Sequence, residues 1–306
     1  MRLQYLRSLP ATWRAHGLSF SQLVESDADV RFAFRAAPLR LDVPTREHRD
    51  RDARPGDWLL RLAPDQRLRA TGGRLITVDV APDVDERELV RWVIGATTTA
   101  ILYQRRLVPL HASAVVIDGS LVAFLAPSNV GKSSLAAACV AEGAVAFADD
   151  TLAVHRGDGV VPASPPGWTQ LRVPAATWTS LDPTAFRVLR EESDGTRIVH
   201  SAPPVADDAL PLAALFLLQI GDRLEVERLT PFDLLTRLRG LLSRPSLSRP
   251  LGVETGVFSS LGQIAAQVPA WRIMRPAGEA SLPAVSAIVR RSLHMHAHDA
   301  PTPGLQ

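Results

Sequence analysis

The sequence predicts an α/β fold with a β-rich N-terminal region, and two observations support this prediction. Residues 126–134 (APSNVGKSS) lie between an apolar run of strand length, 121–125, and an alanine-rich helical pattern over 133–142. Residues 29–42 and 58–80 alternate apolar and charged side chains in places and contain turn signals, which is typical of half-buried strands.

The composition excludes several classes of protein. Basic side chains number 34 and acidic ones 32, and this near balance does not indicate nucleic-acid binding. The single cysteine, Cys139, cannot form an internal disulfide, which is typical of the reducing cytosol. No apolar stretch reaches the roughly 18–20 residues of a membrane span, and the N-terminus lacks a secretory signal pattern. We therefore expect a cytoplasmic protein with no nucleic-acid or membrane partner.

The elements before residue 126 follow from local patterns. Residues 44–57 are charge-rich and bounded by proline, which predicts a loop, and TGG at 71–73 predicts a turn between two strands. Apolar residues at helical spacing predict a helix over 84–104, with Asp83 or Asp85 as its cap.

A hairpin with its turn at Asp118-Gly119 is expected to follow and to lead into the loop at 126. Gly143 ends the helix after that loop.

The elements after Gly143 are predicted in the same way. A short strand, 144–148, is followed by a second hairpin with its turn at 156–159, a rigid loop at 162–167, strands on both sides of Gly221-Asp222, a helix over 230–243, a strand at 270–276 and a helix at 282–293. His294, His296 and His298 alternate in a tail that we expect to be solvated rather than to bind a metal.

Lys132 is the only lysine, whereas the other 33 basic side chains are arginine. It occupies the lysine position of the phosphate-binding pattern G-x-x-x-x-G-K-[ST], with Gly131 before it, Ser133 after it and Ala126 in place of the first glycine. Backbone N–H groups and a helix N-terminus bind phosphates in such loops. The alternative is a chance Gly-Lys-Ser between a strand and a helix. The residues expected to bind a nucleotide are Ala126, Pro127, Ser128, Asn129, Val130, Gly131, Lys132, Ser133 and Ser134.

Two adjacent acids, Asp149 and Asp150, follow the strand after the helix. In a parallel sheet this end of the strand lies beside the phosphate-binding loop. One carboxylate there can hold Mg²⁺ and the other can accept a proton from an attacking hydroxyl. The alternative is a turn with two solvated acids. His111 precedes the loop by one hairpin; taken alone, such a histidine is more often structural than catalytic.

The segment from His111 to Asp150 resembles the catalytic core of bacterial HPr kinase/phosphorylase. That family has a His-Gly start, a hairpin, G-x-S-G-x-G-K-S, a helix, a glycine and A-D-D, and this chain has the corresponding elements in the same order and at matching spacing, ending in Gly143 and Ala148-Asp149-Asp150. The pattern LHASAV, GKSS, ADD is closer still to HPr-kinase-like proteins of peptide-modification gene clusters, some of which phosphorylate a serine of a lasso-peptide precursor. The resemblance is firm over about 105–155 and weak over 160–295, where VPAWRIMRP (268–276) looks similar.

The resemblance implies a P-loop kinase core of the HPr kinase/phosphoenolpyruvate carboxykinase type over 83–306, with ATP and Mg²⁺ as cofactors. It implies that Lys132 neutralises the β- and γ-phosphates and that Ser133 ligates Mg²⁺. It also implies that Asp150 accepts the proton of the substrate serine and that Asp149 assists Asp150 or the metal. His111 corresponds to a histidine that supports this carboxylate. Residues 1–82 are not the N-terminal part of the family, and we expect them to recognise the substrate. Since the family forms hexamers, a homo-oligomer is one option.

The chain departs from the family in several places. Ala126 and Asn129 replace two glycines of the loop, and the downstream G-R-N…E segment of the phosphorylase reaction is not found. Glu191 or Glu192 could replace its glutamate, and an arginine near the γ-phosphate could be Arg172, Arg197, Arg244 or Arg249. Reverse phosphorolysis and HPr as substrate are therefore not expected.

The sequence thus predicts an ATP- and Mg²⁺-dependent kinase for a serine or other hydroxyl of a peptide or small protein. Two alternatives remain open: a small-molecule kinase of the same fold, and a nucleotide-gated peptide-binding module with little catalysis.

Overall fold

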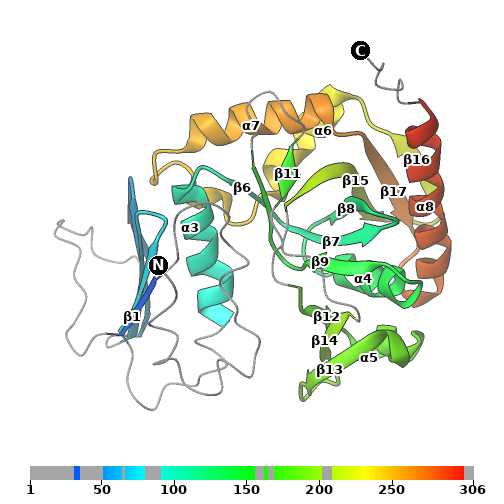
Figure 1. The fold of residues 1–306 in the computed structure, drawn as a ribbon, viewed down its shortest axis with the longest axis horizontal. Helices are drawn as coiled ribbons and strands as arrows, with labels where there is room; N and C mark the ends of the chain where they lie inside the picture. The colour runs from blue at the N-terminus through cyan, green and yellow to red at the C-terminus, as the bar shows by residue number, and fades with distance from the viewer. Residues whose placement is uncertain are drawn as a thin grey trace.

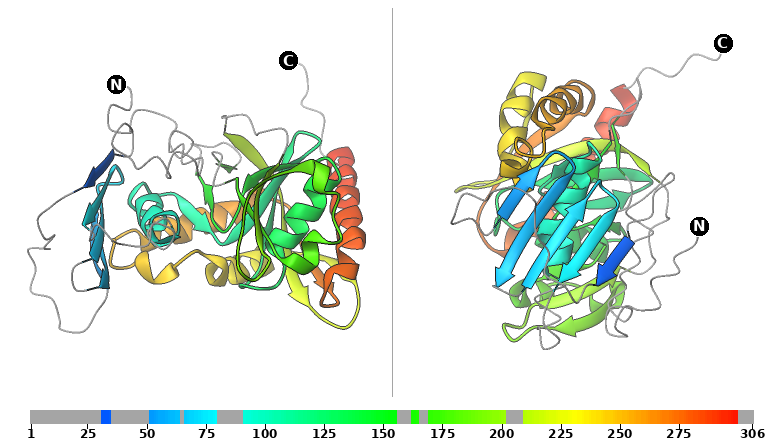
Figure 2. Two further views of the ribbon diagram at one scale, coloured as in Figure 1. Left: turned by 90° about the horizontal axis from the view of Figure 1, so that it is seen from below. Right: turned by 90° about the vertical axis from the view of Figure 1, so that its left-hand side faces the viewer.

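The computed structural model describes residues 31–34, 51–63, 66–79, 91–155, 162–164, 169–201 and 209–299. Within these residues the protein has a mixed α/β fold with several sheets. A five-stranded sheet lies at one end of the molecule, and a seven-stranded sheet flanked by helices lies at the other (Figure 1, Figure 2).

The five-stranded sheet comes from the N-terminal quarter of the chain. Its strands, in the order β1-β5-β4-β3-β2, are β1 (Arg31–Phe34), β5 (Leu75–Asp79), β4 (Gln66–Thr71), β3 (Asp57–Ala63) and β2 (Arg51–Arg54). The predicted turn at 71–73 is confirmed, and it joins β4 to β5.

The predicted loop over 44–57 is wrong at its end, because β2 pairs there with β3. Cross-strand ion pairs such as Arg61–Asp52, 3.3 Å apart, allow a strand without apolar periodicity. The remainder of that loop, 44–50, lies outside the described residues, as do the caps Asp83 and Asp85. The predicted helix is described from residue 91 on. It consists of a π-helical turn, η3 (Val93–Thr97), and α3 (Thr98–Gln104).

The seven-stranded sheet holds the centre of the fold. Its main path is β16 (Glu225–Arg228), β17 (Ala270–Arg275), β15 (Leu210–Ile220), β8 (Ser120–Leu125), β7 (Ala112–Ile117) and β9 (Val145–Ala148), and β11 (Ala163–Ser164) pairs with β15. The sheet is mixed rather than parallel, because β7 is antiparallel to both β8 and β9. It follows that β8 and β9 run in the same direction on either side of β7.

Alternate residues of β8 face two different helical layers. Leu121, Ala123 and Leu125 pack in the cluster that contains α3, α6 (Pro231–Leu238) and α7 (Glu254–Gln267). Val122 and Phe124 pack on the other face with α4 (Lys132–Ala141) and α8 (Leu282–Asp299). Successive strand residues point to opposite faces, so a central strand that is covered on both sides has to be apolar throughout.

Several predictions for the later part of the chain are corrected. β10 (Leu152–Val154) pairs with β6 (Val108–Leu110) instead of forming a local hairpin, and the predicted turn at 156–159 lies outside the described residues. The predicted loop at 162–167 contains β11, and 165–168 lie outside the described residues. β17 inserts between β15 and β16, the strands on both sides of Gly221-Asp222.

Other elements were not predicted at all. These are α7 and a three-stranded sheet with a short helix, comprising β12 (Leu171–Val173), β13 (Phe186–Glu191), β14 (Arg197–Ser201) and α5 (Ala175–Trp178). Short helical turns also occur: η4 (Pro183–Ala185), η5 (Arg239–Leu241), η6 (Pro245–Leu247) and η7 (Glu279–Ser281). The helix predicted at 282–293 continues to residue 299, so His294, His296 and His298 lie on α8 and not in a tail.

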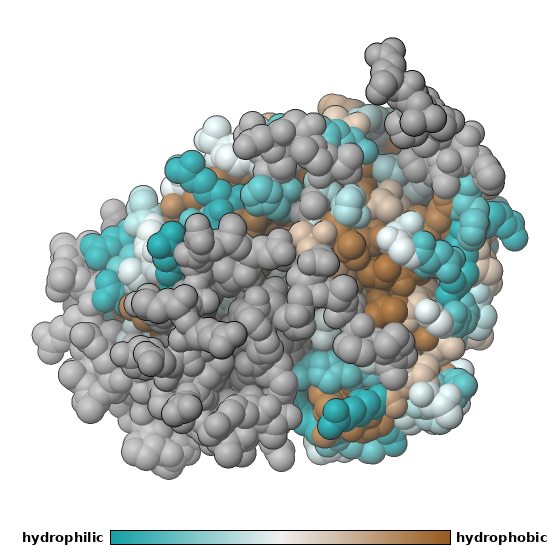
Figure 3. All heavy atoms as spheres, viewed as in Figure 1, coloured by the Kyte–Doolittle hydropathy of each residue, from teal (hydrophilic) through white to brown (hydrophobic). Residues whose placement is uncertain are grey.

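The hydropathy of the surface, the character of the helices and the burial of Cys139 complete the description of the fold. On the face drawn in Figure 3, hydrophobic residues gather over the region of the seven-stranded sheet, and hydrophilic residues lie to their right and below them. Among the helices of the described part, none combines the length and the apolar character needed to cross a bilayer. Cys139 of α4 is buried against α8, and this burial raises the pKa of its thiol to about 12.

Candidate functional site

One edge of the seven-stranded sheet brings the predicted site residues together. The loop 126–131 follows the carboxyl end of β8, and Asp149 and Asp150 follow the carboxyl end of β9. His111 directly precedes β7, which runs the other way between them. The start of an antiparallel strand lies at the same edge as the ends of its neighbours. The topology therefore gathers segments that are far apart in sequence.

The backbone of the loop explains its residue types. Gly131, at the N-terminus of α4, has a φ of +98°, and Asn129 has a φ of +65°. Asparagine is one of the few residues that adopt this left-handed region readily, so it can stand in for a glycine. The φ of Ala126 is not positive, and its methyl group is buried. The two departures from the glycine pattern are thus compatible with a phosphate-binding loop.

Lys132 lies in the first turn of α4 and is only 6% exposed. Its Nζ donates to the carbonyl oxygens of Ala126 (3.0 Å) and Pro127 (3.1 Å) and lies 3.0 Å from Nε2 of His111. Burial lowers the pKa of Lys132, and the nearby charges of Asp149 and Asp150 oppose this shift. The ammonium group is therefore held over the loop by three acceptors, at the positive end of the helix dipole.

Asp149 is the buried acid of the pair, at 6% exposure. Its Oδ1 accepts hydrogen bonds from Ser113 (2.5 Å) and Ser133 (2.8 Å), and its Oδ2 accepts one from the backbone N–H of Arg172 (3.1 Å). Burial raises the pKa of Asp149, whereas these hydrogen bonds act to lower it. Ser113 was not predicted, although a serine in an otherwise apolar strand is a usable signal.

Ser133 and Asp149 form an all-oxygen donor pair, which suits Mg²⁺. Within the described residues there is no cluster of three or more His, Cys, Asp or Glu side chains that could hold a metal by themselves. Phosphate oxygens and water would have to supply the other ligands, as they commonly do for Mg²⁺ in nucleotide sites.

Asp150 is the exposed acid, with 69% of its side chain accessible and a left-handed φ of +67°. Nδ1 of His111 lies 3.4 Å from Oδ1 of Asp150 and 3.0 Å from its backbone oxygen. Because Lys132 donates to Nε2, Nδ1 is the nitrogen of His111 that donates to the backbone oxygen of Asp150. His111 thus links Lys132 to the backbone of Asp150, and the exposed carboxylate of Asp150 lies 3.4 Å from the same nitrogen.

Arg275, the last residue of β17, contacts the loop and was not predicted as a site residue. Its guanidinium is buried, and it donates to the carbonyl oxygen of Val130 (3.0 Å), to those of Pro276 (3.1 Å) and Gly278 (2.8 Å), and to Oγ of Ser281 (2.7 Å). A trans peptide directs its C=O and N–H in opposite directions. The bond to Val130 therefore turns the N–H of Gly131 away from Arg275.

The remaining loop residues differ in their surroundings. Oγ of Ser128 lies 3.4 Å from Nε2 of His111, so this side chain faces the site. Oγ of Ser134 is buried and lies 2.8 Å from Oγ1 of Thr177 on α5, which gives Ser134 a hydrogen-bond partner in the core.

Two of the four arginines considered from the sequence, and both glutamates, have other partners. Arg172 pairs with Glu192 (2.8 Å) and Arg197 pairs with Glu191 (3.0 Å). Each of the two glutamates is thus engaged by an arginine.

Comparisons with known proteins give likenesses among solved structures. No family model matches the chain, and no curated protein matches it. The structure is similar to that of the Hpr(Ser) kinase/phosphatase from Coxiella burnetii, with a TM-score of 0.34 and 14% sequence identity, over 62% of this chain and 94% of that chain. A likeness of this size does not establish a family.

Proposed function

We propose that the protein is an ATP- and Mg²⁺-dependent kinase that phosphorylates a serine or other hydroxyl of a peptide or small protein. The observation that carries this proposal is the connection from Lys132 through His111 to Asp150 at the N-terminus of α4. Under this proposal, Lys132 and the accessible side chain of Asp150, on opposite sides of the His111 imidazole, serve as the cation for the phosphates and the base for the acceptor.

The proposed reaction needs little covalent chemistry from the protein. The hydroxyl oxygen of the acceptor forms a bond to the γ-phosphorus, the bond from this phosphorus to the bridging oxygen of ADP breaks, and the hydroxyl proton passes to the carboxylate of Asp150. The loop N–H groups and Lys132 hold the phosphates in position, and Ser133 and Asp149 would hold Mg²⁺, which supplies charge neutralisation. His111 fixes the orientation of Asp150.

A nucleotide-gated peptide-binding module is the second candidate. The three acceptors around Lys132 favour it, because they satisfy the ammonium group without a phosphate. Tight ATP binding without transfer or hydrolysis would support this candidate over the kinase.

Mass spectrometry after incubation with ATP, Mg²⁺ and either candidate peptides or a metabolite panel tests the kinase and separates peptide from small-molecule acceptors. We expect Lys132→Ala to abolish transfer. Asp150→Asn should lower the transfer rate by roughly 100-fold or more, as removal of a general base does, while the Kd for ATP stays nearly unchanged.

Asp118→Asn is a matched control for Asp150→Asn. Asp118 also has a left-handed φ (+48°) and an exposed side chain (70%), but it lies in the turn between β7 and β8. Its substitution should leave transfer unchanged. Full transfer by Asp150→Asn would exclude Asp150 as the base.

A further inference from the structure

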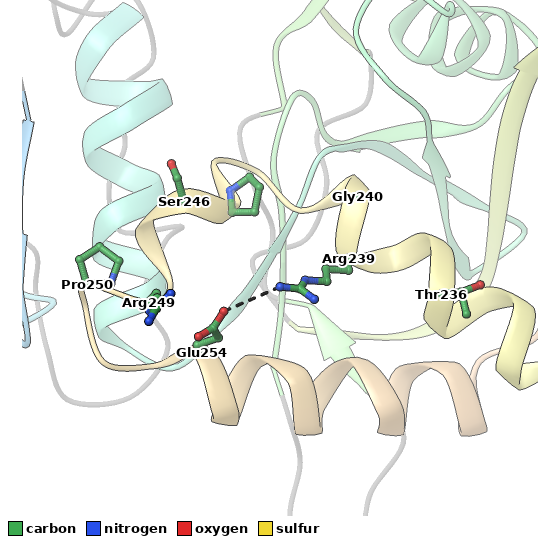
Figure 4. A pocket seen from close by; sticks show the side chains of 8 residues that line it. Thr236, Arg239, Gly240, Ser246, Arg249, Pro250 and Glu254 are labelled. Atoms are coloured by element: carbon green, nitrogen blue, oxygen red, sulfur yellow. Dashed lines mark ion pairs between the residues drawn. The ribbon is translucent and has the colours of Figure 1, made fainter.

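A wide cavity of about 990 Å³ lies between α6, η5, η6 and the start of α7. Figure 4 shows its lining side chains, which come from both sides of the hollow. They include two arginines, Arg239 and Arg249, the hydroxyls of Thr236 and Ser246, and one acid, Glu254. The lining thus combines polar and apolar surface, and its arginines outnumber its acid.

The two arginines are available to a ligand. Nη2 of Arg239 lies 3.9 Å from Oε1 of Glu254, and 75% of the arginine side chain and 52% of the glutamate side chain are exposed. This distance exceeds that of a hydrogen bond, and an exposed ion pair of this kind contributes little free energy. Arg249 is exposed as well. A guanidinium group binds a carboxylate in a bidentate manner, with two parallel N–H···O bonds.

The cavity is built on a segment that is bonded to the candidate active site. Gly240 lines the cavity, and the next residue, Leu241, accepts a hydrogen bond from the backbone N–H of His111 (2.7 Å). Two residues further, the N–H of Ser243 donates to Pro109 (2.8 Å), and Oγ of Ser243 lies 3.1 Å from Oγ1 of Thr151. The segment thus runs beside the residues that precede β7 and follow Asp150.

We propose that this cavity binds the acidic side chains of the peptide that is phosphorylated. The inference deepens the proposed kinase function and rests on it. Arg239 and Arg249 bind aspartate or glutamate side chains of the acceptor, with Glu254 released from Arg239. The 241–243 segment joins the wall of the cavity to the residues around Asp150, so a peptide held in the cavity can present its hydroxyl to Asp150. The cavity is much larger than a single phosphate ion, which favours a peptide as its occupant.

Fluorescence anisotropy with the full chain tests the inference without requiring catalysis. The probes are a fluorescein-labelled peptide with one serine among glutamates, and its counterpart with glutamines. We expect the glutamate peptide to bind, the glutamine peptide to bind at least tenfold more weakly, and the double variant Arg239→Ala/Arg249→Ala to lose the difference, because two charge-assisted contacts are removed. ATP binding by this variant should be unchanged.

The control is Arg187→Ala/Arg223→Ala, which removes the same charge from two exposed arginines of β13 and of the segment before β16. It should bind the glutamate peptide as the wild type does. Equal binding of both peptides by the wild type, equal loss in the control variant, or release of the peptide by inorganic phosphate at the peptide's own concentration would overturn the inference. Specific binding in the cavity without any phosphoryl transfer would instead exclude the kinase while keeping the docking site.

Discussion

At Gly131 the loop uses two separate properties of glycine. The φ of +98° lies in the left-handed region, and a Cβ there would lie 2.3 Å from Nη2 of Arg275. That guanidinium cannot withdraw easily, because it also bonds the turn after β17. The close approach allows Arg275 to reach the carbonyl of Val130.

Gly131→Ala should therefore lower stability more than Gly119→Ala does. Gly119 has a similar φ (+78°) but open space around it, so its substitution costs only the backbone strain, about 1–2 kcal/mol. Urea unfolding measures both costs. We also expect Gly131→Ala, but not Gly119→Ala, to weaken ATP binding in a titration. Equal effects of the two substitutions would contradict the role given to the Arg275 contact.

Arg275→Met removes the hydrogen bonds that join the loop to the turn after β17. We expect a loss of unfolding free energy on the order of 3 kcal/mol, because three carbonyl groups lose a charged donor, together with weaker ATP binding. Arg272→Met on the same strand is the control. Arg272 pairs with Glu227 near the surface (2.6 Å), so its loss should cost less than about 1 kcal/mol. Similar unfolding curves for both variants would show that Arg275 does not support the loop.

At the scale of an element, the N-terminal sheet is held by a buried acid at the start of β3. Asp57 accepts two hydrogen bonds from Arg69 (2.8 and 2.5 Å) and one from Arg54 (3.1 Å). Burial alone would raise the pKa of Asp57, but the bonds to the two arginines outweigh it and leave the pKa below its ordinary value. The ionised carboxylate thus stabilises the folded sheet.

Asp57→Asn should cost about 2 kcal/mol of unfolding free energy at pH 7. A lowered pKa in the folded state means that this stabilisation is present above the unfolded pKa of about 4 and is lost as the pH falls through the folded value. The difference between wild type and variant should therefore shrink below about pH 4. Denaturant unfolding across this range measures it, and a constant difference would contradict the assignment.

At the scale of the whole molecule, one hydrophobic cluster joins the two sheets. It contains Trp58 and Ile76 of the N-terminal sheet, Tyr103 of α3, and Leu125 and Leu215 of the central sheet. Polar contacts from the last two residues of α3 strengthen the connection. The amide of Gln104 bonds backbone groups of Ala70 (2.9 Å) and Gly73 (2.7 Å), and the hydroxyl of Tyr103 donates to Ser243 (3.0 Å).

We therefore expect the five-stranded and seven-stranded sheets to unfold together. Native-state hydrogen exchange should give the amides of β3 and β4 the same unfolding free energy as those of β8 and β15. Exchange of β3 and β4 at a clearly lower free energy would show that residues up to about 82 form a separate cooperative unit.

The sequence by itself determined the central part of the site. A lone lysine after a glycine, an apolar strand before it and an alanine-rich helix after it define a local strand–loop–helix, and these patterns need no distant contact. The Asp118-Gly119 hairpin and the strand before Asp149 were predicted for the same reason. The expectation that both acids and the loop lie at one edge agrees with the structure, although β7 separates their strands.

The tertiary structure alone decided what depends on distant segments. The side chain of Asp149 is buried and that of Asp150 is exposed, a difference that two identical neighbours in a sequence cannot reveal. Arg275 donates a hydrogen bond to Val130, which lies 145 residues away in the sequence. The backbone hydrogen bond from His111 to Leu241 joins the candidate site to the segment that lines the cavity of Arg239 and Arg249. Such pairings follow from the order of strands in a sheet, because hydrogen bonds between strands join residues without regard to their separation along the chain.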